Sequence, residues 1–475
     1  MTSSPAADAS AGTSAGTTAG TAAGRSTSLR RIAFATIIGT TIEWYDFFIY
    51  ATSAGLVFAQ LFFQPAGGEL GLLFSLATVG ISFLFRPLGA FLAGHFGDVI
   101  GRRAVLVITL VLMGAATTLI GVLPTYAQIG IAAPIMLLVL RILQGLSAGG
   151  EWGGAVLMAV EHAPADRRGR AGSWPQLGVP LGFLLASGMT ALMTGLISPG
   201  AAYLEWGWRV PFLVSIVLIA VGFVIRRSVE ESPVFTEIAE RGAQSSVPVL
   251  ELFRRHWHLV LLAALVFAGN GTLGYMTTGG FLNNYAINVQ QIDTTAVLIA
   301  AAFAALVWFG STLLAGILAD TIGRRTTFLL GFALQALIVF PVFWLVDHGG
   351  LPGLYAALVL ISTSLGLTYG PLAAWYSEIF PASVRFSGVS ITYALGAILG
   401  GAFAPLIAQM LLESTGSTIA VSAYLLLASL LGGAATLCLR DRSGIPLGPD
   451  HEAEQASGAT VFTPAAPARE LAARA

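Results

Sequence analysis

Two carboxylates lie one helical turn apart in a strongly apolar stretch near the start of the chain. Glu43 and Asp46 are three positions apart, and Tyr50 follows one turn later. A helix places residues at this spacing on one face. Two acids held that close resist simultaneous ionisation, so one of them can keep a proton that an isolated acid would lose. The spacing predicts a proton-carrying pair; the alternative is that both acids pair with arginines of neighbouring helices and only hold them together.

An arginine and an amide share another apolar segment. Arg141 and Gln144 are one turn apart, and a guanidinium can bind a carboxylate through two parallel hydrogen bonds while the amide donates or accepts beside it. We therefore expect Arg141 and Gln144 to contact a substrate. The alternative for Arg141 is a structural salt bridge to Asp46 or Glu43.

Two further charges lie in apolar segments before residue 227. Arg86 fits a substrate contact and a structural role equally well. Glu151 is flanked by glycines and fits either a second proton site or a partner for Arg86. The remaining residues expected to line a central binding site are neutral: Tyr50, Gln176, Asn270, Tyr275 and Tyr369.

The composition indicates that these charged side chains lie in a bilayer, where each of them is costly. Hydrophobic residues make up 56% of the 475 residues, and charged residues only 10%. A soluble domain carries roughly 25% charged residues because its surface faces water, so most of this surface must face something apolar. An ionised side chain at mid-bilayer costs at least roughly 2.5–3.5 kcal/mol, which makes each one a functional hypothesis. The net charge of −1 gives no field to attract nucleic acid.

Twelve apolar segments are long enough to cross a bilayer. A hydrocarbon core of about 30 Å needs roughly 20 helical residues, and backbone groups in lipid must bond within their own segment. The sequence therefore predicts an all-α integral membrane protein with twelve transmembrane helices. The expected spans are Ile32–Phe62, Gly71–Ala93, Ala104–Leu123, Ile131–Ala159, Trp174–Leu196, Pro211–Ile225, Leu259–Tyr285, Thr295–Leu318, Thr326–Val346, Leu354–Tyr376, Val389–Leu412 and Thr418–Leu439.

Arginines concentrate in alternate loops, and the positive-inside rule places those loops and both termini in the cytoplasm. The end segment 1–28 has almost no large apolar side chain, the end segment 443–475 is polar and rich in Pro and Ala, and both are expected to be disordered. Between them we expect an N-terminal six-helix bundle (29–226), a cytoplasmic linker (227–256) and a C-terminal six-helix bundle (257–442). The arginines that set this orientation are Arg30, Arg31, Arg102, Arg103, Arg167, Arg168, Arg170, Arg226, Arg227, Arg254, Arg255, Arg324, Arg325, Arg385, Arg440 and Arg442.

Two short patterns occur once in each predicted bundle. Residues 94–103 read GHFGDVIGRR and residues 316–325 read GILADTIGRR, with Gly, Asp, Gly, Arg and Arg in register. Repeats in matching loops predict two related, pseudo-symmetric halves. The weaker repeat is Glu161, Pro164, Arg168 and Ser173 against Glu378, Pro381, Arg385 and Ser390.

The first repeat resembles the signature of the major facilitator superfamily, a G-x-x-x-D-x-x-G-R-R/K motif between the second and third helices. The chain is more narrowly similar to the metabolite:H⁺ symporter family, over nearly all of residues 32–442. One departure is Val99, where a basic residue commonly follows the motif aspartate. The segments that carry the similarity are Gly39–Phe48, Phe85–Gly89, Gly94–Asp98, Arg141–Gly145, Gly149–Gly154, Trp206–Phe212 and Glu230–Phe235.

The resemblance implies the major facilitator fold and transport of small organic acids or zwitterions with protons, by rocking of two bundles about a central site. Known members handle shikimate, dicarboxylates and tricarboxylates, 2-oxoglutarate, or proline and betaines. The resemblance also implies that charges of the repeated loops hold a cytoplasmic gate shut; the alternative is that they only enforce topology. These charges are Asp98, Arg102, Glu161, Arg168, Asp320, Arg324, Glu378 and Arg385.

The leading hypothesis is a secondary active transporter that takes up a small organic acid or zwitterionic metabolite with protons by alternating access. The alternative is a proton-antiporting exporter of an apolar or cationic compound on the same fold. No H-E-x-x-H, nucleophile elbow, P-loop or Cys/His metal spacing is present in the sequence, so we expect no enzyme, cofactor or metal. We expect a monomer in the bacterial inner membrane, whose partners are the substrate, protons and lipid.

Overall fold

The computed structural model describes residues 17–100, 102–226, 248–278 and 281–462. For residues 17–28, 94–100, 102–106, 225, 226, 248 and 278 it describes the backbone alone. The side chains of Asp98 and Arg102, two of the predicted gate residues, therefore lie outside the described part. So do residues 227–247 of the predicted linker.

The first half is built from long apolar helices, as predicted. Each crossing is formed by one such helix or by two consecutive ones, as in the span Ala132–Glu161. Its main helices are α1 (Thr17–Ser53), α3 (Gly68–Ile100), α4 (Arg102–Val122), α6 (Ala132–Ala148), α7 (Glu151–Glu161), α8 (Arg168–Leu192) and α9 (Arg209–Arg226), with the short elements η1 (Ala54–Phe58), α2 (Ala59–Leu61), η2 (Gln64–Ala66), α5 (Tyr126–Ile129), η3 (Ala165–Arg167), η4 (Met193–Ile197) and η5 (Tyr203–Gly207).

The second half repeats this pattern. A short helix, α11 (Pro248–Arg255), precedes it within the predicted linker. Its main helices are α12 (Trp257–Thr278), α14 (Thr294–Ile322), α15 (Arg324–Tyr369), α16 (Leu372–Ile379), α17 (Arg385–Gly396), α18 (Ala404–Thr415) and α19 (Thr418–Cys438), with the short elements α13 (Phe281–Asn284), η6 (Tyr285–Val289), η7 (Ala382–Val384), η8 (Ala397–Ala402), η9 (Pro449–His451) and α20 (Glu452–Ala456).

The described residues contain twelve membrane crossings. Ten helices are long and apolar enough to span a membrane, and Val107–Val122 is a shorter apolar helix. One of the ten, Arg324–Ile379, has 56 residues and is bent at Gly350, whose φ of 54° is outside the helical range, so it crosses twice. The structure confirms the predicted all-α fold with twelve transmembrane helices.

The outer surface of the bundle is apolar. Leu196, Val224, Leu314 and Leu337 are between 67% and 75% exposed, and many other large hydrophobic side chains point outward along the same helices. A water-facing surface does not carry apolar area on this scale. The chain is therefore a multi-span membrane protein.

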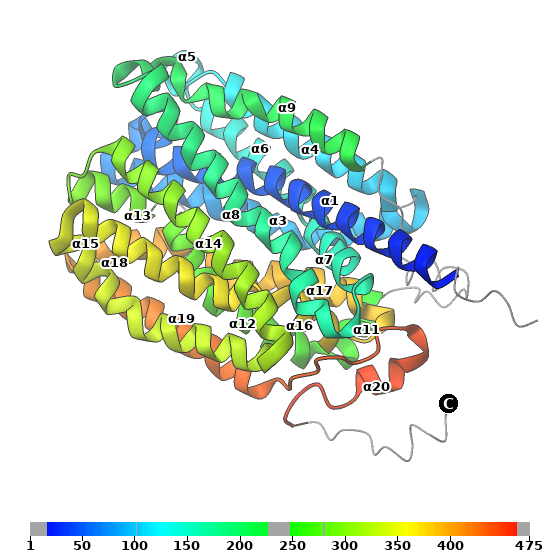
Figure 1. Cartoon of the computed structure of the whole chain (residues 1–475). Helices are drawn as coiled ribbons and strands as arrows, with labels where there is room; N and C mark the ends of the chain where they lie inside the picture. The colour runs from blue at the N-terminus through cyan, green and yellow to red at the C-terminus, as the bar shows by residue number, and fades with distance from the viewer. Residues whose placement is uncertain (1–16, 101, 227–247, 279–280, 463–475) are drawn as a thin grey trace, which may run out of the picture.

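The two halves lie side by side, and helices of one pack against helices of the other. Figure 1 shows α1, α4, α6 and α9 on one side and α12, α15 and α19 on the other. The helix pairs that join the halves include α8/α14, α8/α16 and α3/α17. Both ends of the described chain lie near α11 and α20, whereas α5 and α13 lie at the opposite end (Figure 1). We call the first of these the arginine-rich end, because residues 161–170, 320–325 and 378–385 lie there.

The end segments differ from the expectation of disorder. The backbone of α1 begins at Thr17, inside the predicted disordered segment 1–28. After α19 the chain continues through η9 and α20, and residues 443–462 fold back onto the bundle. Hydrogen bonds to buried arginines and the burial of Ile445 and Leu447 against Val160 hold it in place.

Candidate functional site

A buried ion pair joins α1 to α3. The Nη2 atom of Arg86 lies 4.0 Å from Oε1 of Glu43, and both side chains are almost fully buried. The Arg86 guanidinium also lies 4.4 Å from the centre of the Phe83 ring and 5.6 Å from that of Trp44, within the range of cation–π attraction. Its Nε is buried without a hydrogen-bond partner among the described residues. Because an unsatisfied buried donor is costly, a ligand that offers an acceptor would be favoured here.

Two glycines set the position of Arg86. A Cβ atom at Gly149 would lie 2.1 Å from the backbone oxygen of Arg86, and one at Gly145 would lie 2.1 Å from that of Ser82. No larger residue fits at these distances. Helices α3 and α6 thus pack backbone to backbone, as small residues allow in membranes, and the main chain of Arg86 is fixed against α6.

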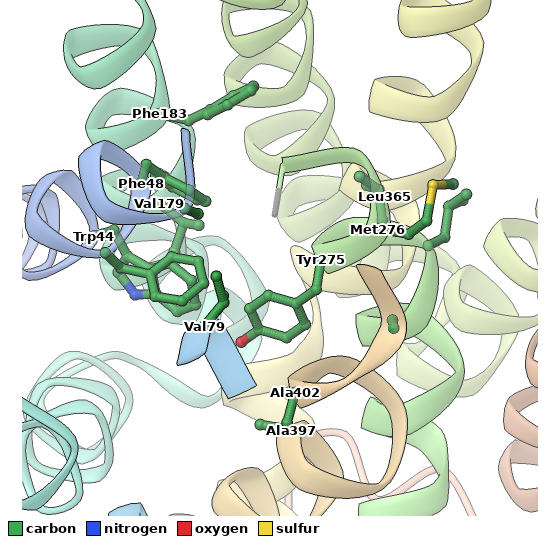
Figure 2. Packing of buried hydrophobic residues seen from close by; sticks show 14 of the residues in the cluster. Trp44, Phe48, Val79, Val179, Phe183, Tyr275, Met276, Leu365, Ala397 and Ala402 are labelled. Atoms are coloured by element: carbon green, nitrogen blue, oxygen red, sulfur yellow. The ribbon is translucent and has the colours of Figure 1, made fainter. Parts of the chain in front are cut away.

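The second half meets this pair with aromatic rings. Tyr275 of α12 stacks on Trp44 with 6.0 Å between ring centres and meets Phe83 edge-on at 4.9 Å. Figure 2 shows Tyr275 extending from α12 toward Val79 and Trp44 of the first half. The contact between the halves beside Arg86 is therefore aromatic.

Arg141 is occupied by its own half. Its Nη1 donates to Oε1 of Gln144 at 2.9 Å, its Nη2 to the carbonyl of Val79 at 2.9 Å, and its Nε to the carbonyl of Thr78 at 3.3 Å. The guanidinium also lies 3.8 Å from the centre of the Tyr50 ring. Each guanidinium nitrogen donates within the first half, so three of the five N–H groups of Arg141 are already bonded there.

Asp46 belongs to the same network through hydroxyl groups. It accepts hydrogen bonds from Thr117 at 2.8 Å and from Ser215 at 2.6 Å. Thr117 in turn accepts from Nε2 of Gln144 at 2.7 Å, so Asp46 is linked to Arg141 through Thr117 and Gln144 rather than by a direct salt bridge. Sequence reasoning missed Thr117 and Ser215, because hydroxyls in apolar helices usually bond to their own backbone.

The other predicted site residues divide between the interface and the helix packing. Glu151 is buried at the first residue of α7, and both of its predicted roles stay predictions. Asn270 accepts a hydrogen bond from Thr368 at 2.6 Å within the second half. Tyr50 donates to Thr78 at 2.6 Å within the first half. Gln176 and Tyr369 lie where the halves meet.

At the arginine-rich end, the second repeat pairs reciprocally. Glu161 and Glu378 are 217 positions apart, as are Arg168 and Arg385. Arg385 lies 3.3 Å from Glu161, and Arg168 lies 3.8 Å from Glu378. Each half thus gives its glutamate to the arginine of the other, as in a two-fold symmetric interface between identical subunits.

Asp320 and Arg324 of the first repeat reinforce this layer. Arg324 binds both carboxylate oxygens of Glu378 at 3.2 Å and Asp320 at 2.8 Å. Asp320 also accepts from the backbone N–H of Gly169 at 2.7 Å and of Arg170 at 2.8 Å. A carboxylate at the first turn of α8 is favoured by the unpaired N–H groups and the helix dipole. The second half therefore caps a helix of the first.

A second reciprocal layer lies a little more than two helical turns deeper. The rings of Trp152 and Tyr393 stack with centres 3.8 Å apart, and Gln176 donates to the carbonyl of Tyr369 at 3.3 Å. Within each half, Trp152 donates to Gln176 at 2.9 Å, and the hydroxyls of Tyr369 and Tyr393 are 3.2 Å apart. Trp152 precedes Tyr369, and Gln176 precedes Tyr393, by the same 217 positions. Sequence reasoning missed the contacts of Trp152 and Tyr393, although this spacing would have found them.

Within the ranges that the structure describes, no group of three or more His, Cys, Asp or Glu side chains is arranged to hold a metal ion.

Comparisons with known proteins agree on one family. The family model of the Major Facilitator Superfamily matches residues 36–405. The chain is 40% identical over 417 residues to the inner membrane metabolite transport protein YhjE of Escherichia coli (strain K12), which covers 85% of this chain and 94% of that protein. It is 35% identical over 425 residues to the shikimate transporter of the same organism, covering 87% of this chain and 94% of that one.

A solved structure shows the same fold. The proton:xylose symporter XylE bound to 6-bromo-6-deoxy-D-glucose aligns with a TM-score of 0.69, 17% sequence identity, and coverage of 89% of this chain and 98% of that chain.

Proposed function

The chain belongs to the Major Facilitator Superfamily as a transmembrane transporter rather than an enzyme, and from that premise we propose that it takes up a small organic acid or zwitterion together with a proton. In this proposal the arginine-rich end and both termini face the cytoplasm of a bacterium, and one chain is the transport unit. The observation that carries the proposal is the buried Glu43–Arg86 pair beside the rings of both halves.

The pair can couple a proton to a carboxylate by charge balance. In the empty protein, the Glu43 carboxylate neutralises Arg86. In the loaded protein, a protonated Glu43 releases Arg86 to a substrate carboxylate, so with a monocarboxylic acid the site again holds one positive and one negative charge. Each half-loaded state, with the proton or the substrate alone, leaves a buried charge without compensation, which costs several kcal/mol. Only the empty and the fully loaded protein can then change conformation easily, and this is symport.

We assign the carboxylate contact to Arg86 in preference to Arg141. Arg141 already uses three of its five N–H groups on two carbonyls and on Gln144, so only the second N–H of Nη1 and of Nη2 is left for a substrate. Arg86 keeps a buried Nε unsatisfied and lies over the Phe83 ring, which Tyr275 of the second half meets edge-on. In this assignment Arg141, Gln144 and Tyr50 hold the first half together, and Tyr275 and Tyr369 contribute to specificity.

The reciprocal layers at the arginine-rich end form the cytoplasmic gate of the proposed cycle. Opening toward the cytoplasm must separate Glu161 from Arg385 and Glu378 from Arg168. Both pairs are buried in the closed gate. Their separation exposes each charge to water, and the hydration regained offsets part of the lost attraction between the charges. The gate can thus be stable when closed and still open at a moderate cost.

A ligand screen on two arginine variants tests the proposal. The purified protein is tested for thermal stabilisation by shikimate, 2-oxoglutarate, citrate, benzoate, proline and glycine betaine, since a ligand that binds the folded form raises its apparent stability. We expect one acid or zwitterion to stabilise the parent protein, Arg86→Met to lose that shift, and Arg141→Met to keep it on a less stable background.

Uptake of the stabilising compound into proteoliposomes then tests the coupling. We expect an imposed inward proton gradient to drive accumulation, and Glu43→Gln to abolish the response to the gradient. Stabilisation only by lipophilic cations would instead support the exporter, and a shift lost in Arg141→Met but kept in Arg86→Met would return the substrate contact to Arg141.

A further inference from the structure

The chain does not leave the bundle at the end of α19. The backbone N–H of Arg440 donates to the carbonyl of Ala459 at 3.0 Å, and that of Val461 donates to the carbonyl of Cys438 at 2.9 Å. Leu439 and Thr460 form an antiparallel bridge between these bonds. Residues 439–461 therefore form a closed loop tied to the second half. We call this loop the C-terminal clasp.

The clasp reaches across to the first half. Nη1 of Arg168 donates to the carbonyl of Ile445 at 2.5 Å. The side chains of Ile445 and Leu447 form a small buried cluster with Val160, which precedes the gate residue Glu161. One arginine and one apolar residue of the first half are thus held by a segment that belongs to the second.

The same loop holds the gate arginine of the second half. Arg385 donates to the carbonyl of Leu447 at 2.9 Å and to Oε1 of Gln455 at 2.9 Å. Gln455 is 1% exposed, and its Oε1 also accepts from the backbone N–H of Ala382 at 2.7 Å. Its Nε2 donates to the carbonyls of Pro446 and Gly448, both at 2.8 Å.

Gln455 is therefore a built part of the clasp. Both polar ends of its side chain are satisfied, and a buried amide with that many partners is costly to replace. Its position turns Arg385 toward Glu161 in the closed gate. Ala382 lies in η7, just before the helix that carries Arg385, so one amide holds both the arginine and the turn that presents it.

We propose that the C-terminal clasp stabilises the closed cytoplasmic gate, with Gln455 as a positioning residue for Arg385. The proposal rests on the rocking motion of the proposed function. Opening the arginine-rich end moves Arg168 and Val160 away from the second half, so it must break the bond to Ile445 and expose Ile445 and Leu447. The clasp adds these contacts to the reciprocal ion pairs, and the gate is held by three segments of the chain rather than two.

A labelling experiment measures gate opening without any substrate or proton gradient. Ser390 is buried beneath the gate, and its Oγ lies 2.0 Å from the position of a Cβ at Gly153 of the other half. The only cysteine of the chain, Cys438, is first replaced by serine. Ser390→Cys is then labelled in the purified full-length protein with a water-soluble maleimide, and the labelling rate reports how often the halves separate there.

Three changes are compared in this background. Gln455→Ala removes the positioning amide; Glu454→Ala is the matched control, because the neighbouring side chain is partly exposed at 39% and its backbone carbonyl is retained. Gln455→Glu keeps an acceptor for Arg385. Since hydrogen bonds to charged groups are the stronger ones, we expect labelling to be about tenfold faster in Gln455→Ala and unchanged in Glu454→Ala. We expect an intermediate rate in Gln455→Glu, because it keeps the acceptor for Arg385 but loses the two bonds that Nε2 donates.

Truncation provides a second variant. Removal of residues 463–475 leaves the clasp intact and should not change the labelling rate, whereas removal of 443–475 should raise it at least as much as Gln455→Ala. Melting temperatures measured on the same samples separate gate opening from loss of fold. Labelling that stays at the parent rate in folded Gln455→Ala overturns the proposal, as does equal acceleration by both truncations. Either result leaves the substrate assignment to Arg86 standing, because no ligand is used.

Discussion

Helices α7 and α8 of the first half and α16 and α17 of the second are built on one repeat, yet their likeness fades with distance from the arginine-rich end. The residue pairs closest to that end are identical in type. In the next layer the equivalent residues differ in type, but each half still contacts the other there. From the end inward the pairs are Glu161/Glu378, Arg168/Arg385, Trp152/Tyr369 and Gln176/Tyr393.

Deeper in the bundle the likeness is lost. At the same spacing of 217 positions, Glu151 corresponds to Thr368 and Arg141 to Leu358. The charged member is on the first half each time. Residues that must meet their own copies in the other half have kept a symmetric pairing. Residues that make no such contact have diverged.

The largest effect is expected at the buried pair of Glu43 and Arg86, both of which belong to the first half. Arg86→Met leaves Glu43 buried without its partner, and we expect the free energy of unfolding to fall by about 3–5 kcal/mol. Addition of Glu43→Gln should recover most of that loss, because a neutral pair needs no compensation. Thermal unfolding of the parent, both single variants and the double variant gives the coupling energy. A double variant no more stable than Arg86→Met would show that the two charges do not form a pair.

The two gate carboxylates, Glu161 and Glu378, should contribute differently to stability although they occupy equivalent positions of the repeat. Glu378 binds Arg324 through both oxygens and also faces Arg168, whereas Glu161 pairs with Arg385. We expect Glu378→Gln to destabilise the protein by about 3 kcal/mol or more and Glu161→Gln by about 1–2 kcal/mol. Melting temperatures measured side by side test this. Equal losses would mean that the gate is as symmetric in energy as it is in sequence.

Substitutions in the layer of Trp152 and Tyr393 should reduce stability by smaller and equal amounts in the two halves. Tyr393→Phe keeps the stack on Trp152 and removes the hydroxyl contact with Tyr369, while Trp152→Phe keeps a ring and removes the bond to Gln176. We expect each to cost about 1 kcal/mol, the value of one hydrogen bond. A loss several-fold greater for one of them in thermal unfolding would show that this layer has diverged in the same way as the centre.

Asp46 should be the least sensitive of the charged positions in stability. Its two partners are hydroxyls, which can donate to or accept from an amide, so Asp46→Asn should change the free energy of unfolding by less than about 1 kcal/mol. Measurements of the uptake rate of Asp46→Asn and of its response to a proton gradient decide the role of Asp46. Normal coupling in Asp46→Asn agrees with proton binding at Glu43; lost coupling at unchanged stability would move the proton site to Asp46.

Much of this architecture could be predicted because it depends on properties that single residues carry. Apolar length gave the twelve crossings, and the repeated motifs gave the two halves. The partners of Arg141 could not be predicted, because two of them are the backbone carbonyls of Thr78 and Val79. Every residue has a backbone carbonyl, so the pattern of side chains does not indicate which carbonyls accept. The same reason explains the clasp. Ile445 and Leu447 hold Arg168 and Arg385 through carbonyl oxygens, so their segment looked like an unstructured tail.

The close contact of α3 with α6 has a consequence for genetics. A side chain at Gly145 or Gly149 would meet the backbone of Ser82 or Arg86 at 2.1 Å, so any substitution there pushes the two helices apart and displaces the guanidinium. A saturation-mutagenesis survey of growth on the substrate should rank these two glycines as intolerant as Arg86 itself. Their intolerance would record the spacing of two main chains and not a chemical role, so a residue that binds nothing would look indispensable for binding.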